Sequence, residues 1–160
     1  MKIHKKNILL TSYPFCCKND EPFKLLQKNG FTIIGSVIDN KKKLTKEEII
    51  SYIGNADAVI AGTEKYDSEI LKYAEKLKLI SRLGIGLDNI DFKETRKRKI
   101  TVAYTPDAPS KAVAELTIGL MITAGRRVLN VDKDLRNEKW NRFVGLDISN
   151  KTIGIIGLGR

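Results

Sequence analysis

The regular alternation of short apolar runs with polar, helix-like segments most constrains the fold of this 160-residue chain. Each apolar run has the length and composition of a buried strand. The five runs span residues 7–12, 31–34, 58–61, 77–83 and 100–103. Only a few residues connect each run to the helical segment beside it. This pattern predicts an α/β fold with a doubly wound parallel sheet.

Helix-start signals stand between these runs. Pro22 lies in the first turn of a segment that begins at Glu21 and ends before Gly30. Thr45 and Glu48 have the spacing of a capping box at the start of residues 46–53. The other two starts are Asp67 or Ser68, before a helix extending to residue 74, and Asp91, before a helix that ends in the basic residues 96–99. Every predicted strand therefore has a helical crossover beside it.

Ligands of doubly wound sheets bind outside the carboxyl ends of the strands, which here are followed by residues 13–17, 62–65, 83–89 and 104–109. The loop 83–89 carries Gly84 and Gly86, and two readings of it remain open. The glycines expose backbone N–H groups to a bound oxygen anion, or they simply allow a tight turn. Asp88 and Asn89 are candidates for a helix cap.

The composition changes after Pro106, and we place a domain boundary near residues 104–110. Ser110 is predicted to cap a helix over residues 111–127, whose apolar residues cover almost its whole circumference. Such a helix is expected to be buried between two domains or across a subunit interface. Glu115 within it is an interface hydrogen-bonding group or a functional carboxylate. A polar helix is predicted over residues 130–138.

The last ten residues read KTIGIIGLGR. Ile153, Ile155 and Ile156 predict a buried strand that leads into Gly157 and Gly159. A strand followed by Gly-x-Gly is the start of a dinucleotide-binding βαβ unit, in which the glycines allow a tight turn and a close backbone approach to a pyrophosphate. Two glycines alone are a weak form of that motif.

The net charge is +10, from 29 basic and 19 acidic residues, and basic clusters lie at residues 2–6, 41–43 and 96–99. Because no aromatic residues are interleaved with them, they predict a solvated surface rather than nucleic-acid binding. No apolar run is long enough to cross a membrane, and the apolar core 8–10 is too short for a signal peptide, so we expect a cytoplasmic protein. Cys16 and Cys17 are predicted to be reduced thiols, and the single histidine, His4, argues against a metal site.

Four segments together resemble the D-isomer-specific 2-hydroxyacid dehydrogenases, a family that includes D-3-phosphoglycerate dehydrogenase and glyoxylate/hydroxypyruvate reductase. The segments are ISRLGIGLDNID, TVAYTPDAPSKAVAELTIGLMITAGRR, EKW and KTIGIIGLGR. They occur in the family's order and at its spacing. The resemblance implies a flavodoxin-like substrate-binding domain over residues 1–103 and the start of a Rossmann NAD(P)-binding domain over residues 104–160.

The resemblance also implies site residues. The backbone of Ile85 and Gly86 would hold a substrate carboxylate, and Val113 would border the cofactor. The pyrophosphate turn would begin with Gly157, Leu158, Gly159 and Arg160. The reaction would be hydride transfer between NAD, or NADP, and C2 of a small 2-hydroxy or 2-oxo acid. The family's arginine, glutamate and histidine of catalysis lie further along, so no catalytic residue is expected in these 160 residues, and we expect them to be inactive alone.

Some positions depart from the phosphoglycerate type. Members of that type often have an Arg-Ser pair after the third strand, where this chain has Ala61 and Gly62, and asparagine is common at the position of Tyr104. The acid is therefore left open between the phosphoglycerate and the glyoxylate/hydroxypyruvate types. A homodimer through the helix 111–127 is expected. The alternatives are a non-catalytic NAD-sensing regulator or assembly platform, and a free-standing flavodoxin-like module, against which the apolar helix argues.

Overall fold

The computed structural model describes residues 6–13, 15–35, 43–157 and 159. The chain divides into two compact units, Met1–Pro106 (unit 1) and Asp107–Arg160 (unit 2). Of the predicted features, His4, Leu158, Arg160 and most of the basic residues 2–6 and 41–43 lie outside the described residues.

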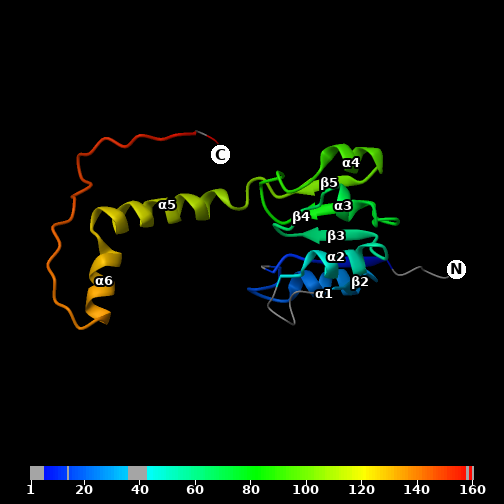
Figure 1. The fold of residues 1–160 in the computed structure, drawn as a ribbon, viewed down its shortest axis with the longest axis horizontal. Helices are drawn as coiled ribbons and strands as arrows, with labels where there is room; N and C mark the ends of the chain where they lie inside the picture. Colours follow the sequence, from blue (N-terminus) through cyan, green and yellow to red (C-terminus); the bar gives the residue numbers. More distant parts are fainter. Residues whose placement is uncertain (1–5, 14, 36–42, 158, 160) are drawn as a thin grey trace. The chain divides into compact units, whose positions relative to one another are not determined.

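Unit 1 is built on one five-stranded sheet in which all observed strand pairs are parallel (Figure 1). Its strands are β1 (Asn7–Leu10), β2 (Thr32–Ile34), β3 (Ala58–Ala61), β4 (Leu79–Arg82) and β5 (Thr101–Tyr104). The spatial order is β2-β1-β3-β4-β5. The chain adds β2 on one side of β1 and then adds β3, β4 and β5 in turn on the other side. The predicted doubly wound parallel sheet is confirmed.

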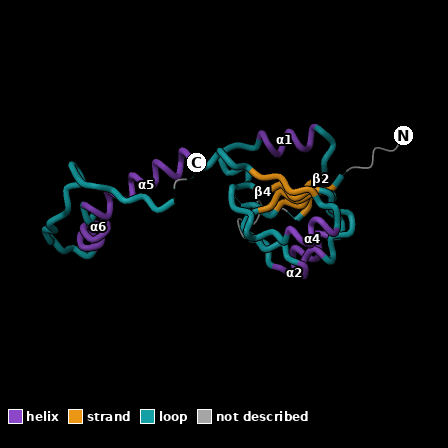
Figure 2. The backbone as a smooth tube through the Cα atoms, turned by 90° about the horizontal axis from the view of Figure 1, so that it is seen from above, coloured by secondary structure: helices purple, strands orange, loops and turns teal. Residues whose placement is uncertain are grey.

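Helices cover the sheet from both sides. They are α1 (Glu21–Lys28), α2 (Lys46–Ile53), α3 (Ser68–Leu71) and α4 (Phe92–Lys97). Figure 2 shows α1 on one face and α2 and α4 on the opposite face. The helix α3 is shorter than predicted, because its chain continues in tight turns in which Tyr73 and Ala74 donate to the carbonyls three residues before them.

Local sequence signals account for the starts of three helices. The capping box of α2 is present, with Glu48 N–H donating to Thr45 Oγ1 at 3.2 Å and Thr45 N–H donating to Glu48 Oε2 at 2.7 Å. Asp67 caps α3 by accepting from the N–H groups of Glu69 and Ile70. Asp91 caps α4 in the same way. These caps satisfy N–H groups that have no partner inside their own helices.

The hydrophobic core of unit 1 lies between the sheet and the layer formed by α2, α3 and α4. Val59, Ile80 and Leu9 point into it from the strands, and all three are fully buried. Ile53 and Leu71 meet them from the helices. Successive strand residues alternate between faces, so the apolar residues of β3 and β4 contribute to both sides of the sheet. No residue of α1 is buried, so the second face is covered more thinly.

Unit 2 contains α5 (Ser110–Gly125) and α6 (Val128–Arg136), separated by Arg127 in the left-handed conformation. Ser110 does not cap α5: Pro109 occupies the cap position and no side chain caps the helix. The expected burial of this helix is not found within the chain, where Leu116 is 61% exposed and no α5 residue is buried. An all-apolar helix needs neighbours on every side, and the described part of unit 2 supplies few.

The prediction of a strand near the end of the chain is also wrong. Residues 151–157 form no strand, and Ile156 is fully exposed. A strand satisfies its backbone groups by pairing with another strand. No strand is present among the described residues of unit 2, so the β-branched residues have nothing to pair with.

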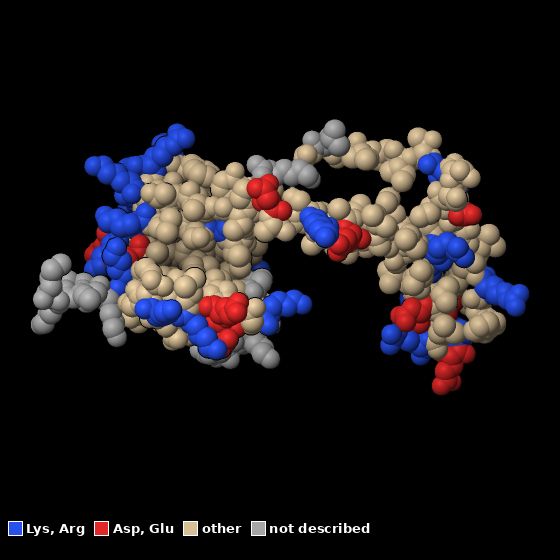
Figure 3. Space-filling view, turned by 180° about the vertical axis from the view of Figure 1, so that it is seen from behind, with Lys and Arg blue, Asp and Glu red and all other residues tan. Residues whose placement is uncertain are grey.

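Charged side chains are spread over the surface. Figure 3 shows lysine and arginine side chains gathered over the end of unit 1 that carries α4, with acidic side chains beside them. Some of these charges pair: Glu94 accepts from Arg98 Nε at 3.0 Å and lies 3.5 Å from Lys97 Nζ. No helix among the described residues is both long and apolar enough to span a membrane.

Candidate functional site

The loops after β1, β3, β4 and β5 meet at the carboxyl edge of the sheet in unit 1. Adjacent parallel strands lie about 4.8 Å apart, so residues at their ends come within reach of one small ligand. The pairs Ala61–Arg82 and Arg82–Tyr104 are opposite each other in the sheet, which places the ends of β3, β4 and β5 side by side.

The loop after β4 presents backbone N–H groups that have no partner among the described residues, beginning with Ile85 and Gly86. Gly84 has φ +144°, a conformation that side chains disfavour. Its N–H is 2.8 Å from Thr105 Oγ1, and its carbonyl accepts from Thr105 N–H at 3.1 Å. The N–H groups of Ile85 and Gly86 have no partner among the described residues, and Ile85 is 48% exposed. Adjacent free N–H groups of this kind form an anion-binding nest.

Arg82, the last residue of β4, adds positive charge beside this nest. A Cβ atom at Gly84 would lie 2.6 Å from its Nη1, so the guanidinium covers the glycine. The Nη1 group donates to the carbonyl of Leu83, and Nε is buried without a partner among the described residues. Sequence reasoning missed Arg82. The available signal was a charged residue at the end of a strand, immediately before the glycine loop.

Asn89 joins this loop to the loop after β3. Its Nδ2 donates to the carbonyls of Glu64 at 2.7 Å and Gly62 at 3.2 Å. The backbone carbonyl of Asn89 accepts from Tyr66 N–H at 2.7 Å. Asp91, rather than Asp88 or Asn89, caps the following helix. The cap interpretation of Asn89 is therefore wrong, because its side chain is used across the sheet edge instead of along the chain.

A buried hydrogen-bond chain lies beneath the two loops. Thr11 Oγ1 is 2.7 Å from Tyr66 Oη and 3.1 Å from Glu64 Oε2. Carboxylate and carbonyl oxygens only accept, so the Thr11 hydroxyl proton is shared between Glu64 Oε2 and the Ile60 carbonyl at 3.3 Å, and Tyr66 donates to Thr11. Gly62 N–H also donates to Thr11 Oγ1, at 3.3 Å. Burial raises the pKa of Tyr66, so this hydroxyl stays protonated and keeps donating.

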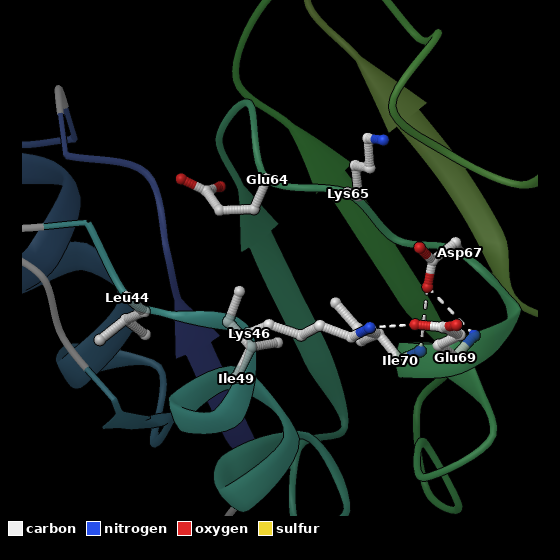
Figure 4. A pocket seen from close by; sticks show the side chains of 8 residues that line it. All are labelled: Leu44, Lys46, Ile49, Glu64, Lys65, Asp67, Glu69 and Ile70. Carbon is white, nitrogen blue, oxygen red and sulfur yellow. Dashed lines mark hydrogen bonds and ion pairs between the residues drawn. The ribbon is translucent and has the colours of Figure 1, made fainter.

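A separate pocket of about 460 Å³ lies between α2, α3 and the loop after β3 (Figure 4). The side chain of Lys46 reaches across it to pair with Glu69, and Asp67 is occupied as the cap of α3. Glu64 also lines the pocket but points away from this ion pair (Figure 4). Lys46 and Glu69 are therefore paired with each other, and Asp67 is occupied by the backbone of α3.

The loop after β1 carries both cysteines, and both are free. Cys16 has φ +63°, and Cys17 Sγ donates to the carbonyl of Tyr13 at 3.1 Å. The described residues contain no group of three or more histidine, cysteine, aspartate or glutamate side chains able to hold a metal ion.

The sequence-predicted site residues fall in different units. Ile85 and Gly86 belong to unit 1, where the structure brings them beside Arg82. Val113 lies on α5 in unit 2 and is 57% exposed. Gly157 has φ +90°, and a Cβ atom there or at Gly159 would meet nothing within 4 Å. Glu115 is an exposed residue of α5, with no partner among the described residues.

Residues 8–153 match the family described as D-isomer specific 2-hydroxyacid dehydrogenase, catalytic domain. The chain belongs to this family. It is 44% identical over 146 residues to D-3-phosphoglycerate dehydrogenase of Methanocaldococcus jannaschii, a match that covers 89% of this chain and 26% of that protein. It is 38% identical over 123 residues to glyoxylate reductase of Thermofilum pendens, covering 72% of this chain and 36% of that protein.

Solved structures agree with this assignment. NAD+-bound 3-phosphoglycerate dehydrogenase of Entamoeba histolytica is 34% identical, with a TM-score of 0.65 over 76% of this chain and 40% of that one. The chain thus spans between about a quarter and two fifths of the relatives it matches. The family predicted from the glycine loop and the motifs after it is confirmed.

Proposed function

We propose that this chain forms the substrate-binding part of an NAD-dependent dehydrogenase that acts on a small 2-hydroxy acid. The observation that carries the proposal is the pair of unpaired N–H groups at Ile85 and Gly86, beside the guanidinium of Arg82. Such donors fit the two oxygens of a carboxylate. By their names, one relative oxidises a 2-hydroxy acid, 3-phosphoglycerate, and the other reduces a 2-oxo acid, glyoxylate.

In this proposal the nest fixes the substrate carboxylate and thereby the position of C2, from which hydride leaves. Thr105 and Asn89 keep the loop in shape, because each binds it to a neighbouring segment of unit 1. Holding the reacting carbon in one place is a large part of catalysis in a two-substrate reaction. The acid/base and carboxylate-orienting side chains implied by the family lie outside these 160 residues.

We propose that unit 2 begins the NAD-binding part, with Val113 bordering the cofactor and residues 157–160 starting the pyrophosphate turn. NAD supplies the hydride acceptor when bound, and NADP is not distinguished from it by the residues present. The positive φ of Gly157 and the open space around Gly157 and Gly159 are compatible with close approach of a pyrophosphate. Leu158 and Arg160 lie outside the described residues.

We also propose that α5 packs against a second copy of the chain, giving a homodimer. Its support is the exposed apolar surface of α5, where Val113, Leu116 and Leu120 are all more than half exposed. Apolar patches of this extent mark interfaces in soluble proteins. Sedimentation equilibrium tests this, and a clean monomer at micromolar concentration contradicts it.

The two free cysteines fit a cytoplasmic location.

The catalytic proposal is tested on the full gene product with a panel of 2-oxo acids and NADH or NADPH. We expect oxidation of the reduced cofactor with small 2-oxo acids, and loss of substrate affinity in Arg82→Gln. Cofactor binding without turnover on any acid would instead support the non-catalytic NAD-sensing regulator. The 160-residue chain alone is expected to produce no NADH from any 2-hydroxy acid.

A further inference from the structure

The carboxylate of Glu64 lies over the end of β3 and makes a hydrogen bond to Thr11. Thr11 donates to its Oε2, and the hydroxyl of the buried Tyr66 in turn donates to Thr11. A Cβ atom at Gly62 would lie 2.6 Å from Oε2 and 3.1 Å from Oε1. The carboxylate therefore occupies the space that a side chain at position 62 would fill. Its Oε1 has no hydrogen-bond partner among the described residues.

This carboxylate belongs to the same structural unit as the anion-binding nest. The Asn89 amide bonds the carbonyl of Glu64 itself and lies three residues after Gly86. Ala61, three residues before Glu64, pairs with Arg82 across β3 and β4, so the loop after β3 starts beside the loop that carries the nest. Arg82 in turn covers Gly84. Asn89 also bonds the carbonyl of Gly62, the glycine that lies beneath the Glu64 carboxylate, so the loop after β3 is joined to the loop that presents the nest.

From this arrangement we infer that Glu64 determines substrate specificity: its carboxylate disfavours an anionic group on C3 of the acid and accepts a hydrogen bond from a C3 hydroxyl. The inference rests on the proposed function, because it assumes that the substrate carboxylate binds at Ile85 and Gly86. It also assumes that a three-carbon acid held there extends over the end of the adjacent strand, β3. A phosphate in that place, with a charge between about −1 and −2, is repelled by the Glu64 carboxylate.

Three acids with one carbon skeleton separate these effects. D-Glycerate has a C3 hydroxyl, D-3-phosphoglycerate has a phosphate at the same position, and D-lactate has neither. The preferred acid is expected to be D-glycerate, because its hydroxyl can donate to the free Oε1 of Glu64. D-Lactate should bind more weakly, since it leaves that oxygen without a donor. D-3-Phosphoglycerate should bind most weakly of the three.

The experiment is a titration of the isotope-labelled full gene product with each acid, followed by the amide NMR shifts of Gly84, Ile85 and Gly86. In Glu64→Gln the repulsion is removed while an acceptor oxygen is kept. Affinity for D-3-phosphoglycerate should rise about tenfold relative to D-glycerate. Glu64→Asp keeps the charge and should keep the discrimination. The matched control is Glu69→Gln, which removes an acidic charge on α3 and should change the ratio less than about twofold.

The outcomes separate the two proposals. If none of the acids shifts the three amides, the nest does not bind carboxylates and the proposed function fails. If the acids bind there but the ratio of D-3-phosphoglycerate to D-glycerate affinity is the same in the wild type and in Glu64→Gln, the role of Glu64 is overturned and the nest stands. A dispersed amide spectrum of each variant verifies that it is folded.

Discussion

The conformation of Gly84 gives a sharp test of how the nest is built. Its φ of +144° lies in a region that is nearly closed to residues with a side chain, so Gly84→Ala must strain or rearrange the loop. A strained backbone of this kind costs roughly 1–3 kcal/mol. The added Cβ would also meet Arg82 Nη1 at 2.6 Å, and that guanidinium can move aside at small further cost.

For a domain of the size of unit 1, a loss of about 2 kcal/mol lowers the melting temperature by roughly 10 °C. Thermal unfolding of the 160-residue chain, followed by circular dichroism, measures this shift. Gly86→Ala is the matched control, because its Cβ would approach only the movable Asp88 carboxylate at 3.1 Å and its φ is ordinary. The reasoning is refuted if Gly84→Ala melts within about 2 °C of the wild type, or if both variants lose the same stability.

Two further predictions concern caps and buried hydroxyls. Thr45→Ala removes the side-chain half of the capping box of α2 and should lower the free energy of unfolding by about 1 kcal/mol in urea titrations, whereas Thr45→Ser should cost little. Tyr66 stays neutral in the folded chain because burial raises its pKa, while an unfolded tyrosine ionises near pH 10. Stability should therefore fall as the pH rises above about 10, and Tyr66→Phe should remove that part of the decline at the cost of the Thr11 hydrogen bond. An unchanged decline in Tyr66→Phe would contradict the assignment to this hydroxyl.

Much of unit 1 follows from local sequence. Thr45 with Glu48 specifies the start of α2, and Ala58–Ala61 is the strand that its composition predicts. Strand and helix signals of this kind depend on a few neighbouring residues, so the predicted elements form with little dependence on the rest of the chain. The glycines of the loop after β4 likewise predict an exposed backbone. The sequence motifs around them are enough to identify the family.

The signals failed where a residue needs a distant partner. Ile155 and Ile156 have the composition of a strand, yet a strand forms only by pairing, and the described residues of unit 2 offer no second strand. Asn89 has the composition of a helix cap, yet its amide bonds Gly62 and Glu64 across the sheet edge. Both outcomes depend on which segments the fold brings together, and no local pattern encodes that.

The sequence by itself determined the alternation of elements, the parallel sheet and the glycine loop, because these depend on apolar periodicity and on backbone freedom at single residues. Only the tertiary structure decided what surrounds that loop. It placed Arg82 over Gly84, and it fixed Glu64 above Gly62 through Thr11, which is 53 residues away in the chain. Hydrogen bonds and charges act through space rather than along the sequence, so the chemistry of the site became visible only when the strand ends were set side by side.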